Sequence, residues 1–230
     1  MAYAFGAPSI VQDGLVFYVD AANKDSYPGS GTTVTDIIEK ETATLQSSGM
    51  FANNNAGVFA FDGVNNYYQY DPLSINMYSV SIWFNPSVGW NNTTYNSTPL
   101  SFDDFKVAVH FGDITGAYDS LLSIWTNDNQ SNYYVGSGKT IDATWNHAAF
   151  NWETNKYQIY LNGKSVTTSA NLTPNLINTS YMDFIGVGKW FRSGYGTPFN
   201  GDMGPIQIYN RALLAEEVKQ NYNALKGRFI

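Results

Sequence analysis

The stretch "GPIQIYNRALLAEEV" (residues 204–218) contains a change of hydrophobic period that decides the fold. Ile206 and Ile208 alternate with Gln207 and Tyr209, which is typical of a half-buried strand. The apolar positions that follow fall three or four apart, as on one stripe of a helix, and are Leu214, Val218, Tyr222 and Leu225. The sequence therefore predicts a last strand and, directly after it, one short C-terminal helix over residues 213–226.

The ends of this helix differ in quality. Glu216 and Glu217 stand in its first turn, where the helix dipole favours negative charge, and Gly227 is expected to end it and leave a tail at 227–230. No Ser, Thr, Asp or Asn stands at the N-cap. Because a short, weakly capped helix depends on packing more than on propensity, we expect its apolar stripe to close one edge or end of the fold.

The rest of the chain favours strands. Short apolar stretches separated by Gly, Asn, Asp and Ser clusters are typical of an all-β sandwich or barrel. The expected strands cover residues 14–20, 57–63, 79–85, 105–112, 120–126, 145–152, 157–163, 181–188 and 204–210. Long loops are expected at 21–57 and 86–104, where the alternation lapses. We predict a single domain over residues 1–230, with an N-terminal arm at 1–9.

Two of these strands carry finer predictions. In residues 79–85, Val80, Ile82 and Phe84 share one face, so Trp83 on the other face is either a surface aromatic or a contact with a further layer. Residues 145–168 are expected to form a hairpin through "ETNK", followed by a tight reversal at Asn162-Gly163, since Asn and Gly tolerate positive φ.

The composition excludes several classes of protein. With a net charge of −7 and only 12 Lys and Arg among 230 residues, the chain lacks the basic footprint of a nucleic-acid-binding protein. It contains no Cys, which removes disulfides and thiolate metal sites, and no apolar run has the length of a membrane span. Its first residues lack a signal-peptide pattern, so we expect assembly in a reducing cytoplasm.

Four motifs in order resemble the concanavalin A-like lectin/glucanase superfamily, and within it the laminin-G-like jelly rolls of tailed-phage structural proteins. They are "GLVFYVDAANKDSYPGSGTT" (14–33), "FAFDGVNNYYQY" (59–70), "WNHAAF…YQIYLNGK" (145–164) and "FNGDMGPIQIYNRALLAEEV" (199–218). The resemblance implies an antiparallel jelly-roll sandwich with a short C-terminal α-helix. Two departures are Leu214, where the family usually has a capping Ser, and "IIEKETATL" (37–45), which replaces a Gly-rich run.

Enzymatic chemistry is not expected. Glucanases of this fold use a Glu-x-Asp-x-Glu set on one strand, whereas Glu39 and Glu41 lack a third carboxylate and Glu216 and Glu217 belong to the helix. The chain has two histidines; His147 matches the hairpin motif of the family and is interpreted as structural, and His110 is expected to be partly exposed. We predict no catalytic residues.

No cofactor is predicted. Ca²⁺, which several lectins and laminin-G domains of this fold bind, is the metal with the most support, and its candidate loops are "TNDNQSN" (126–132) and "FDDF" (102–105). Clusters of Asn and Asp are more often turns, so these loops name no ligands.

Two loops, "GWNNTTYN" (89–96) and "KWFRSGYG" (189–196), combine aromatic rings with amides or a guanidinium, as sugar-binding surfaces do. Such residues also suit a loop that packs on the sandwich or on a neighbouring subunit. The candidate ligand- or partner-binding residues are Trp90, Tyr95, Asn96, Trp190, Phe191, Arg192 and Tyr195. Candidate assembly contacts at the chain ends, which are usually disordered unless bound, are Tyr3, Phe5, Arg228, Phe229 and Ile230.

The sequence leaves two functional hypotheses. The first is a non-enzymatic structural protein of a tailed-phage virion, assembled in the bacterial cytoplasm and in contact with other virion proteins or copies of itself. The second is a carbohydrate-binding adhesin that recognises host-surface glycans, with or without Ca²⁺. Neither nucleic acid nor membrane is an expected partner, and the sequence does not distinguish head, neck and tail.

Overall fold

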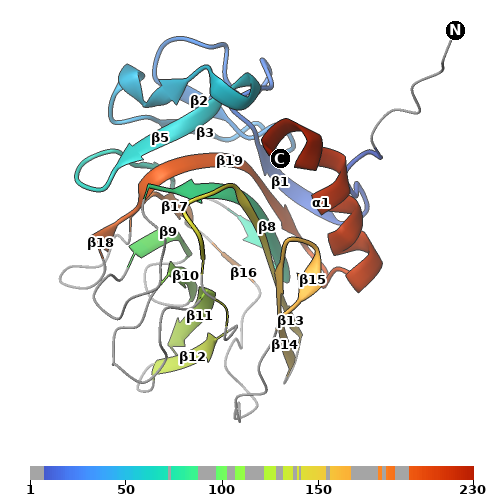
Figure 1. Ribbon diagram of the computed structural model, residues 1–230. Helices are drawn as coiled ribbons and strands as arrows, with labels where there is room; N and C mark the ends of the chain where they lie inside the picture. Colours follow the sequence, from blue (N-terminus) through green and yellow to red (C-terminus); the bar gives the residue numbers. More distant parts are fainter. Residues whose placement is uncertain are drawn as a thin grey trace, which may run out of the picture.

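The strands of the chain form two large β-sheets that face each other, and one helix lies on the outside of the larger sheet (Figure 1). The computed structural model describes residues 8–71, 74–87, 97–102, 107–111, 122–127, 132–136, 139, 141–153, 156–166, 181–182, 185–189 and 197–230. Within them, the prediction of an all-β sandwich with a C-terminal helix is confirmed.

The larger sheet has eight strands. Its order is β15 (Lys164–Ser165), β14 (Lys156–Leu161), β13 (Asn146–Glu153), β8 (Ser79–Pro86), β19 (Asn200–Tyr209), β5 (Val58–Asp62) and β4 (Phe51–Ala52), while β1 (Leu15–Val19) also pairs with β19. The first residues of β19 pair with β5 and its last residues with β1, and the register shifts between Met203 and Ile206. The shift is in the pairing with β8, and on the opposite edge of β19 the two shorter strands follow one another.

The smaller sheet has seven strands. Its order is β12 (Asn132–Gly136), β11 (Leu122–Asn127), β10 (Val107–Phe111), β9 (Ser97–Phe102), β17 (Ile185–Val187) and β6 (Tyr68–Tyr70), and β18 (Thr197–Pro198) pairs with β9 in parallel. Short pairs and turns complete the structure: β16 (Tyr181–Met182) with β7 (Ile75–Asn76), β2 (Thr33–Thr35) with β3 (Thr42–Thr44), and the 3₁₀ helices η1 (Ser48–Met50) and η2 (Asn54–Ala56).

Two regions expected to be loops contain strands. Residues 86–104 include β9, whose six residues are all buried, so Ser and Thr do not mark an exposed face there. Residues 21–57 include the β2–β3 hairpin. Most of the segment 37–45, which replaces a Gly-rich run of the family, lies in this hairpin. Its turn is held by Asp36, a buried carboxylate that accepts hydrogen bonds from the backbone N–H groups of Ile38 and Glu39.

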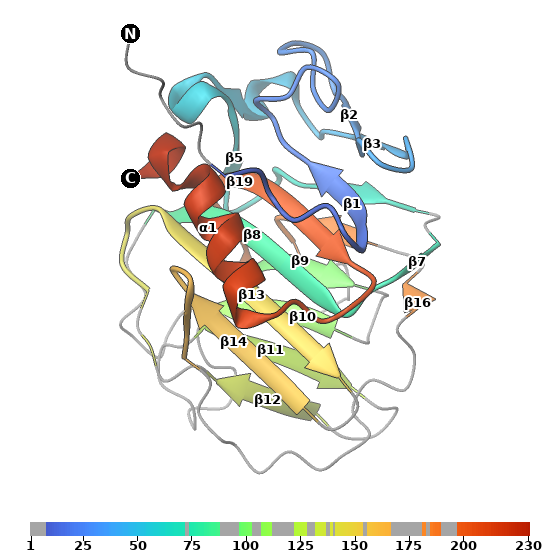
Figure 2. The ribbon, with the colours of Figure 1, turned by 90° about the vertical axis from the view of Figure 1, so that its right-hand side faces the viewer.

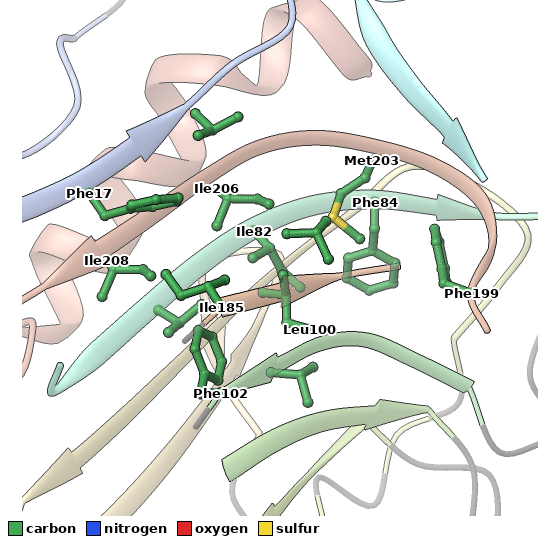
Figure 3. Packing of buried hydrophobic residues seen from close by; sticks show 14 of the residues in the cluster. Phe17, Ile82, Phe84, Leu100, Phe102, Ile185, Phe199, Met203, Ile206 and Ile208 are labelled. Atoms are coloured by element: carbon green, nitrogen blue, oxygen red, sulfur yellow. The ribbon is translucent and has the colours of Figure 1, made fainter. Parts of the chain in front are cut away.

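The core lies between the two sheets (Figure 3). Ile82 and Ile206 come from the larger sheet and Leu100 and Ile185 from the smaller, and all four are fully buried. Each such side chain contributes about 1.5–3 kcal/mol through burial. The alternation predicted for residues 79–85 is confirmed, since Val80, Ile82 and Phe84 belong to this core.

The outer face of the larger sheet is covered by α1 (Ala215–Phe229), which crosses in front of β19, β8 and β13 in Figure 2. Trp83 is 1% exposed beneath it. The indole stacks on Tyr222 with ring centroids 5.6 Å apart and on Phe229 at 4.7 Å. Of the two alternatives for Trp83, contact with a further layer is therefore correct.

The helix differs from its prediction at both ends. It continues through Gly227 to Phe229, so the expected tail is mostly helical and only Ile230 follows it. Arg228 explains the extension: its guanidinium pairs with Asp20 at 2.7 Å and donates to the backbone oxygens of Asn55 and Gly57, which fixes the last turn. At the start, the Glu217 carboxylate accepts the Leu214 backbone N–H at 2.8 Å and substitutes for the missing N-cap side chain.

Candidate binding surface at the loop end

The described residues that flank the two aromatic loops lie at one end of the sandwich, near the label of β18 in Figure 1. The loop at 88–96 follows Ser87 and ends before Ser97, and the loop at 190–196 follows Lys189 and ends before Thr197. Ser97 and Thr197 are paired in the parallel β9–β18 ladder. The positions that directly follow the two loops are therefore neighbours.

The residues that precede the two loops are joined to the same part of the sandwich by backbone hydrogen bonds. The Ser87 backbone N–H donates to the oxygen of Asn200, the first residue of β19. On the other side of β18, Phe199 donates to the oxygen of Gly188, which itself donates to Pro99. We call the end of the sandwich formed by the 62–67 turn, Ser87, Lys189 and Asn200 the loop end.

A tight turn after β5 forms one side of the loop end. One carboxylate oxygen of Asp62 accepts three backbone N–H groups, those of residues 64, 65 and 66, at 2.8–2.9 Å. Desolvation opposes ionisation, but these donors outweigh it and hold the pKa of Asp62 below its ordinary value. The turn presents Val64, which is 61% exposed, and the exposed Asn65.

The turn is joined to the smaller sheet by Lys189. Its ammonium lies 4.9 Å from the centroid of the Tyr67 ring, within range of a cation–π interaction. The Lys189 carbonyl accepts the Ser101 hydroxyl from β9. The described residues around the loop end thus offer an ammonium, a hydroxyl and amides beside the exposed Val64, which are groups that can bind a polar ligand.

The residues predicted at the two loops lie outside the described residues: Trp90, Tyr95, Asn96, Trp190, Phe191, Arg192 and Tyr195. What the structure establishes is the position of the strands from which they extend. The sequence analysis missed the contribution of Asp62, Tyr67 and Lys189. The signal that identifies the turn is "FDGVNN", because Asp followed by Gly and Asn favours a turn closed by the Asp side chain.

The chain-end residues have different surroundings. Tyr3 and Phe5 lie outside the described residues. Arg228 and Phe229 make their contacts within the chain, with Asp20 and with Trp83 and Trp145, and Phe229 is only 7% exposed. These contacts leave Ile230, which is 67% exposed, as the described chain-end residue with free surface for a neighbour.

The interpretation of His147 as structural agrees with its surroundings. The ring is fully buried beneath α1, with Nε2 2.9 Å from the Ser81 hydroxyl, and burial lowers the pKa of the imidazole to about 3. His110 belongs to β10, and its side chain lies outside the described residues. A neutral, enclosed imidazole cannot reach a substrate.

Metal binding has no described site. No group of three or more His, Cys, Asp or Glu that could hold an ion occurs among the described residues. The candidate calcium loops fall largely outside them, at 103–106 and 128–131. In the same described part of the chain, no helix combines the length and the apolar character needed to cross a bilayer.

Sequence comparison gives the family of this sandwich. The profile of the concanavalin A-like lectin/glucanases superfamily, laminin-G type, matches residues 62–219. The chain belongs to this superfamily. The matched segment begins at the Asp62 turn and ends within α1, so it includes both aromatic loops. A comparison with curated proteins finds no match.

Solved structures with the same fold include carbohydrate-related proteins. Domain 4 of an extracellular arabinanase from Geobacillus stearothermophilus, in complex with arabinotriose, is 18% identical with a TM-score of 0.65, and the match covers 90% of this chain and 98% of that one. Trypanosoma rangeli sialidase, in complex with sialic acid, is 12% identical with a TM-score of 0.64; the match covers 98% of this chain and 37% of the sialidase. At these identities the likeness shows the fold alone.

A third similar structure is the receptor-binding domain of botulinum neurotoxin type G. It is 16% identical with a TM-score of 0.61, and the match covers 91% of this chain and 51% of that one. The chain thus corresponds to one whole domain of the arabinanase, but to only about a third of the sialidase and half of the toxin fragment.

Proposed function

We propose that the chain is a non-enzymatic structural protein of a tailed-phage virion that displays its lectin-like jelly roll, with the loop end as the recognition surface. The observation that supports display is the convergence of both aromatic loops on paired strands, Ser97 beside Thr197. A rigid sandwich that presents two loops at one end is a common arrangement for binding surfaces.

The virion setting rests on the resemblance of residues 199–218 to phage jelly rolls. In the structure this stretch joins the central strand β19 to the covering helix. Its Arg211 binds Asp13 at 2.8 Å and Glu217 at 2.6 Å, which ties the strand–helix junction to the segment before β1. The expected partners are other virion proteins and further copies of this chain.

A second candidate is a carbohydrate-binding adhesin that recognises host-surface glycans. A specific observation favours it, since the arabinanase domain of similar fold was solved with arabinotriose and matches over 98% of its length. Sugar rings stack on aromatic side chains while amides bind their hydroxyls, and the two loops supply Trp90 and Trp190 with several Asn. The two candidates are compatible, because a virion protein can also bind glycans.

The surroundings of the four glutamates whose side chains the structure describes support the non-enzymatic part of the proposal. Glu39 and Glu41 are exposed in the β2–β3 turn, Glu216 is exposed on α1, and Glu217 is bound to Arg211. Most glycoside hydrolases use two carboxyl groups that flank the scissile glycosidic bond. None of these four is placed for that role.

Two measurements test the proposal. Quantitative mass spectrometry of purified particles should find this chain in a fixed ratio to the major shell protein, and its absence from particles would contradict a virion role. A glycan array should show binding that is lost in Trp90→Ala with Trp190→Ala and kept in Ile38→Ser, a control at an exposed apolar residue of the β2–β3 turn, outside the loop end. Binding unaffected by the double substitution would contradict recognition at the loop end.

A further inference from the structure

Beyond the C-terminal end of α1, the outer face of the larger sheet carries a row of polar side chains that the helix does not cover. Asp202 of β19 is in register with Asn85 of β8 on one side and Ala60 of β5 on the other. All three are partly exposed and point away from the core, since their strand neighbours Met203, Phe84 and Phe59 are buried in it. Asp202 and Asn85 are therefore neighbouring side chains on an accessible face.

An aromatic ring continues the row. Trp145 precedes Asn146, which pairs with Phe84, so alternation places Trp145 on the outer face next to Asn85. The indole is partly exposed, and its centroid lies 4.4 Å from that of Phe229 in the last turn of α1. Phe229 thus supports the ring from the side of the helix.

An amide closes the row at its other end. Asn54 of η2 is exposed and donates its side-chain N–H to the Asp202 carboxylate at 3.3 Å. Burial raises the pKa of Asp202 against the lowering effect of this hydrogen bond. The carboxylate is therefore short of the donors that water would give it, and a ligand that brings O–H groups would restore them.

We propose that Trp145, Asn85, Asp202 and Asn54, here called the outer strip, form a saccharide-binding subsite that adjoins the loop end at Ser87 and Asn200 but contains none of its residues. The aromatic face takes the C–H face of a sugar ring, and the carboxylate and amides bind its hydroxyls. Two steps between neighbouring strands separate Trp145 from Asp202, about 10 Å in all, so the strip spans more than one sugar ring.

The same residues argue against other ligands. A negative carboxylate at the centre of the strip disfavours phosphate groups and hence nucleic acid. A single carboxylate is too few ligands for Ca²⁺. The row is polar apart from Trp145 and the methyl group of Ala60, so it lacks the apolar centre of a stable protein interface.

This inference takes its class of ligand, a saccharide, from the proposed function. The position of the subsite comes from the outer strip alone. The test is isothermal titration calorimetry of the full chain with arabinotriose and with gluco- and galacto-trisaccharides. Asp202→Asn should weaken binding about tenfold, because the acceptor of the sugar hydroxyls loses its negative charge, and Asn85→Ala about threefold. Asp71→Asn removes an exposed carboxylate elsewhere and should leave the affinity unchanged.

The outcomes separate the two sites. Loss of affinity in the outer-strip variants, with affinity kept when Trp90 and Trp190 are changed to Ala, supports the subsite. Loss only in the Trp90 and Trp190 variant overturns the subsite and leaves the loop end standing. If none of these trisaccharides binds the wild-type chain, the subsite is also overturned.

Discussion

The helix-covered face and the loop end of this molecule are built from different kinds of contact. Under α1, side chains from distant parts of the sequence pack on one another, with Trp83 against Tyr222 and Phe229. At the loop end, contacts are mainly backbone hydrogen bonds and the turn closed by Asp62. The first arrangement concentrates stability in a few side chains, while the second leaves side chains free to vary for binding.

The first prediction removes the centre of the helix-covered face. Trp83→Ala should lower the free energy of unfolding by about 3–5 kcal/mol, because a fully buried indole and its two ring contacts are lost. Chemical denaturation monitored by circular dichroism measures this change. Trp83→Phe keeps an aromatic ring and should cost less than half as much. Equal stability of Trp83→Ala and wild type would show that α1 does not depend on this contact.

The second prediction concerns the last turn of α1. Arg228→Leu leaves Asp20, whose side chain is 7% exposed, without its cation and should cost about 3 kcal/mol. Lys226→Met removes an exposed cation from the same turn and is expected to cost less than about 0.5 kcal/mol. Denaturation curves of the two variants, compared side by side, decide the matter. Similar curves would contradict a structural role for the Arg228–Asp20 pair.

The third prediction is a pH dependence. Burial lowers the pKa of His147 to about 3 in the folded chain. In the unfolded chain the imidazole takes up a proton near pH 6.5, whereas in the folded chain it stays neutral until the pH approaches 3. The contribution of neutral His147 is complete above pH 6.5 and falls, by up to about 1.4 kcal/mol per pH unit, as the pH decreases toward 3. His147→Gln should flatten this part of the stability–pH curve. An unchanged slope in that variant would mean that other groups cause the acid sensitivity.

The smallest effect is expected at the loop end. Asp62→Ala removes the acceptor of three backbone N–H groups in an exposed turn and should cost about 1–2 kcal/mol. Asp62→Asn keeps an acceptor oxygen and should recover most of that loss. Thermal unfolding of both variants measures the difference. If Asp62→Ala destabilised the chain as much as Trp83→Ala does, the contrast between the two regions would fail.

Local sequence patterns predicted the fold where a single pattern describes the whole environment of a strand. Residues 79–85 show this, because alternation alone places Ile82 in the core. The hairpin at Asn162-Gly163 was also predicted, and both residues have positive φ in the structure, at 50° and 74°. The change of period at residues 204–218 correctly predicted a strand followed by a helix.

Contacts between distant segments escaped the sequence analysis. β9 was missed because burial on all sides removes the alternation that marks a strand, even with Pro99 and two Ser in it. The helix continues past Gly227 because Arg228 binds Asp20, which lies 208 residues away in the sequence. A local sequence pattern cannot predict a contact at that separation. The outer strip was missed for the same reason, since its residues come from four separate segments.

The most direct test of the central claim is to map glycan binding onto the backbone amides of the isotopically labelled chain by NMR. A glycan identified on the array should shift the amides at the loop end, namely 63–67, 87, 189 and 200. It should leave unmoved the amides of the helix-covered face, such as 83 and 147 in the sheet and 222 in α1. Shifts confined to residues around α1, with none at the loop end, would contradict the division of the molecule into a stabilising face and a recognition end.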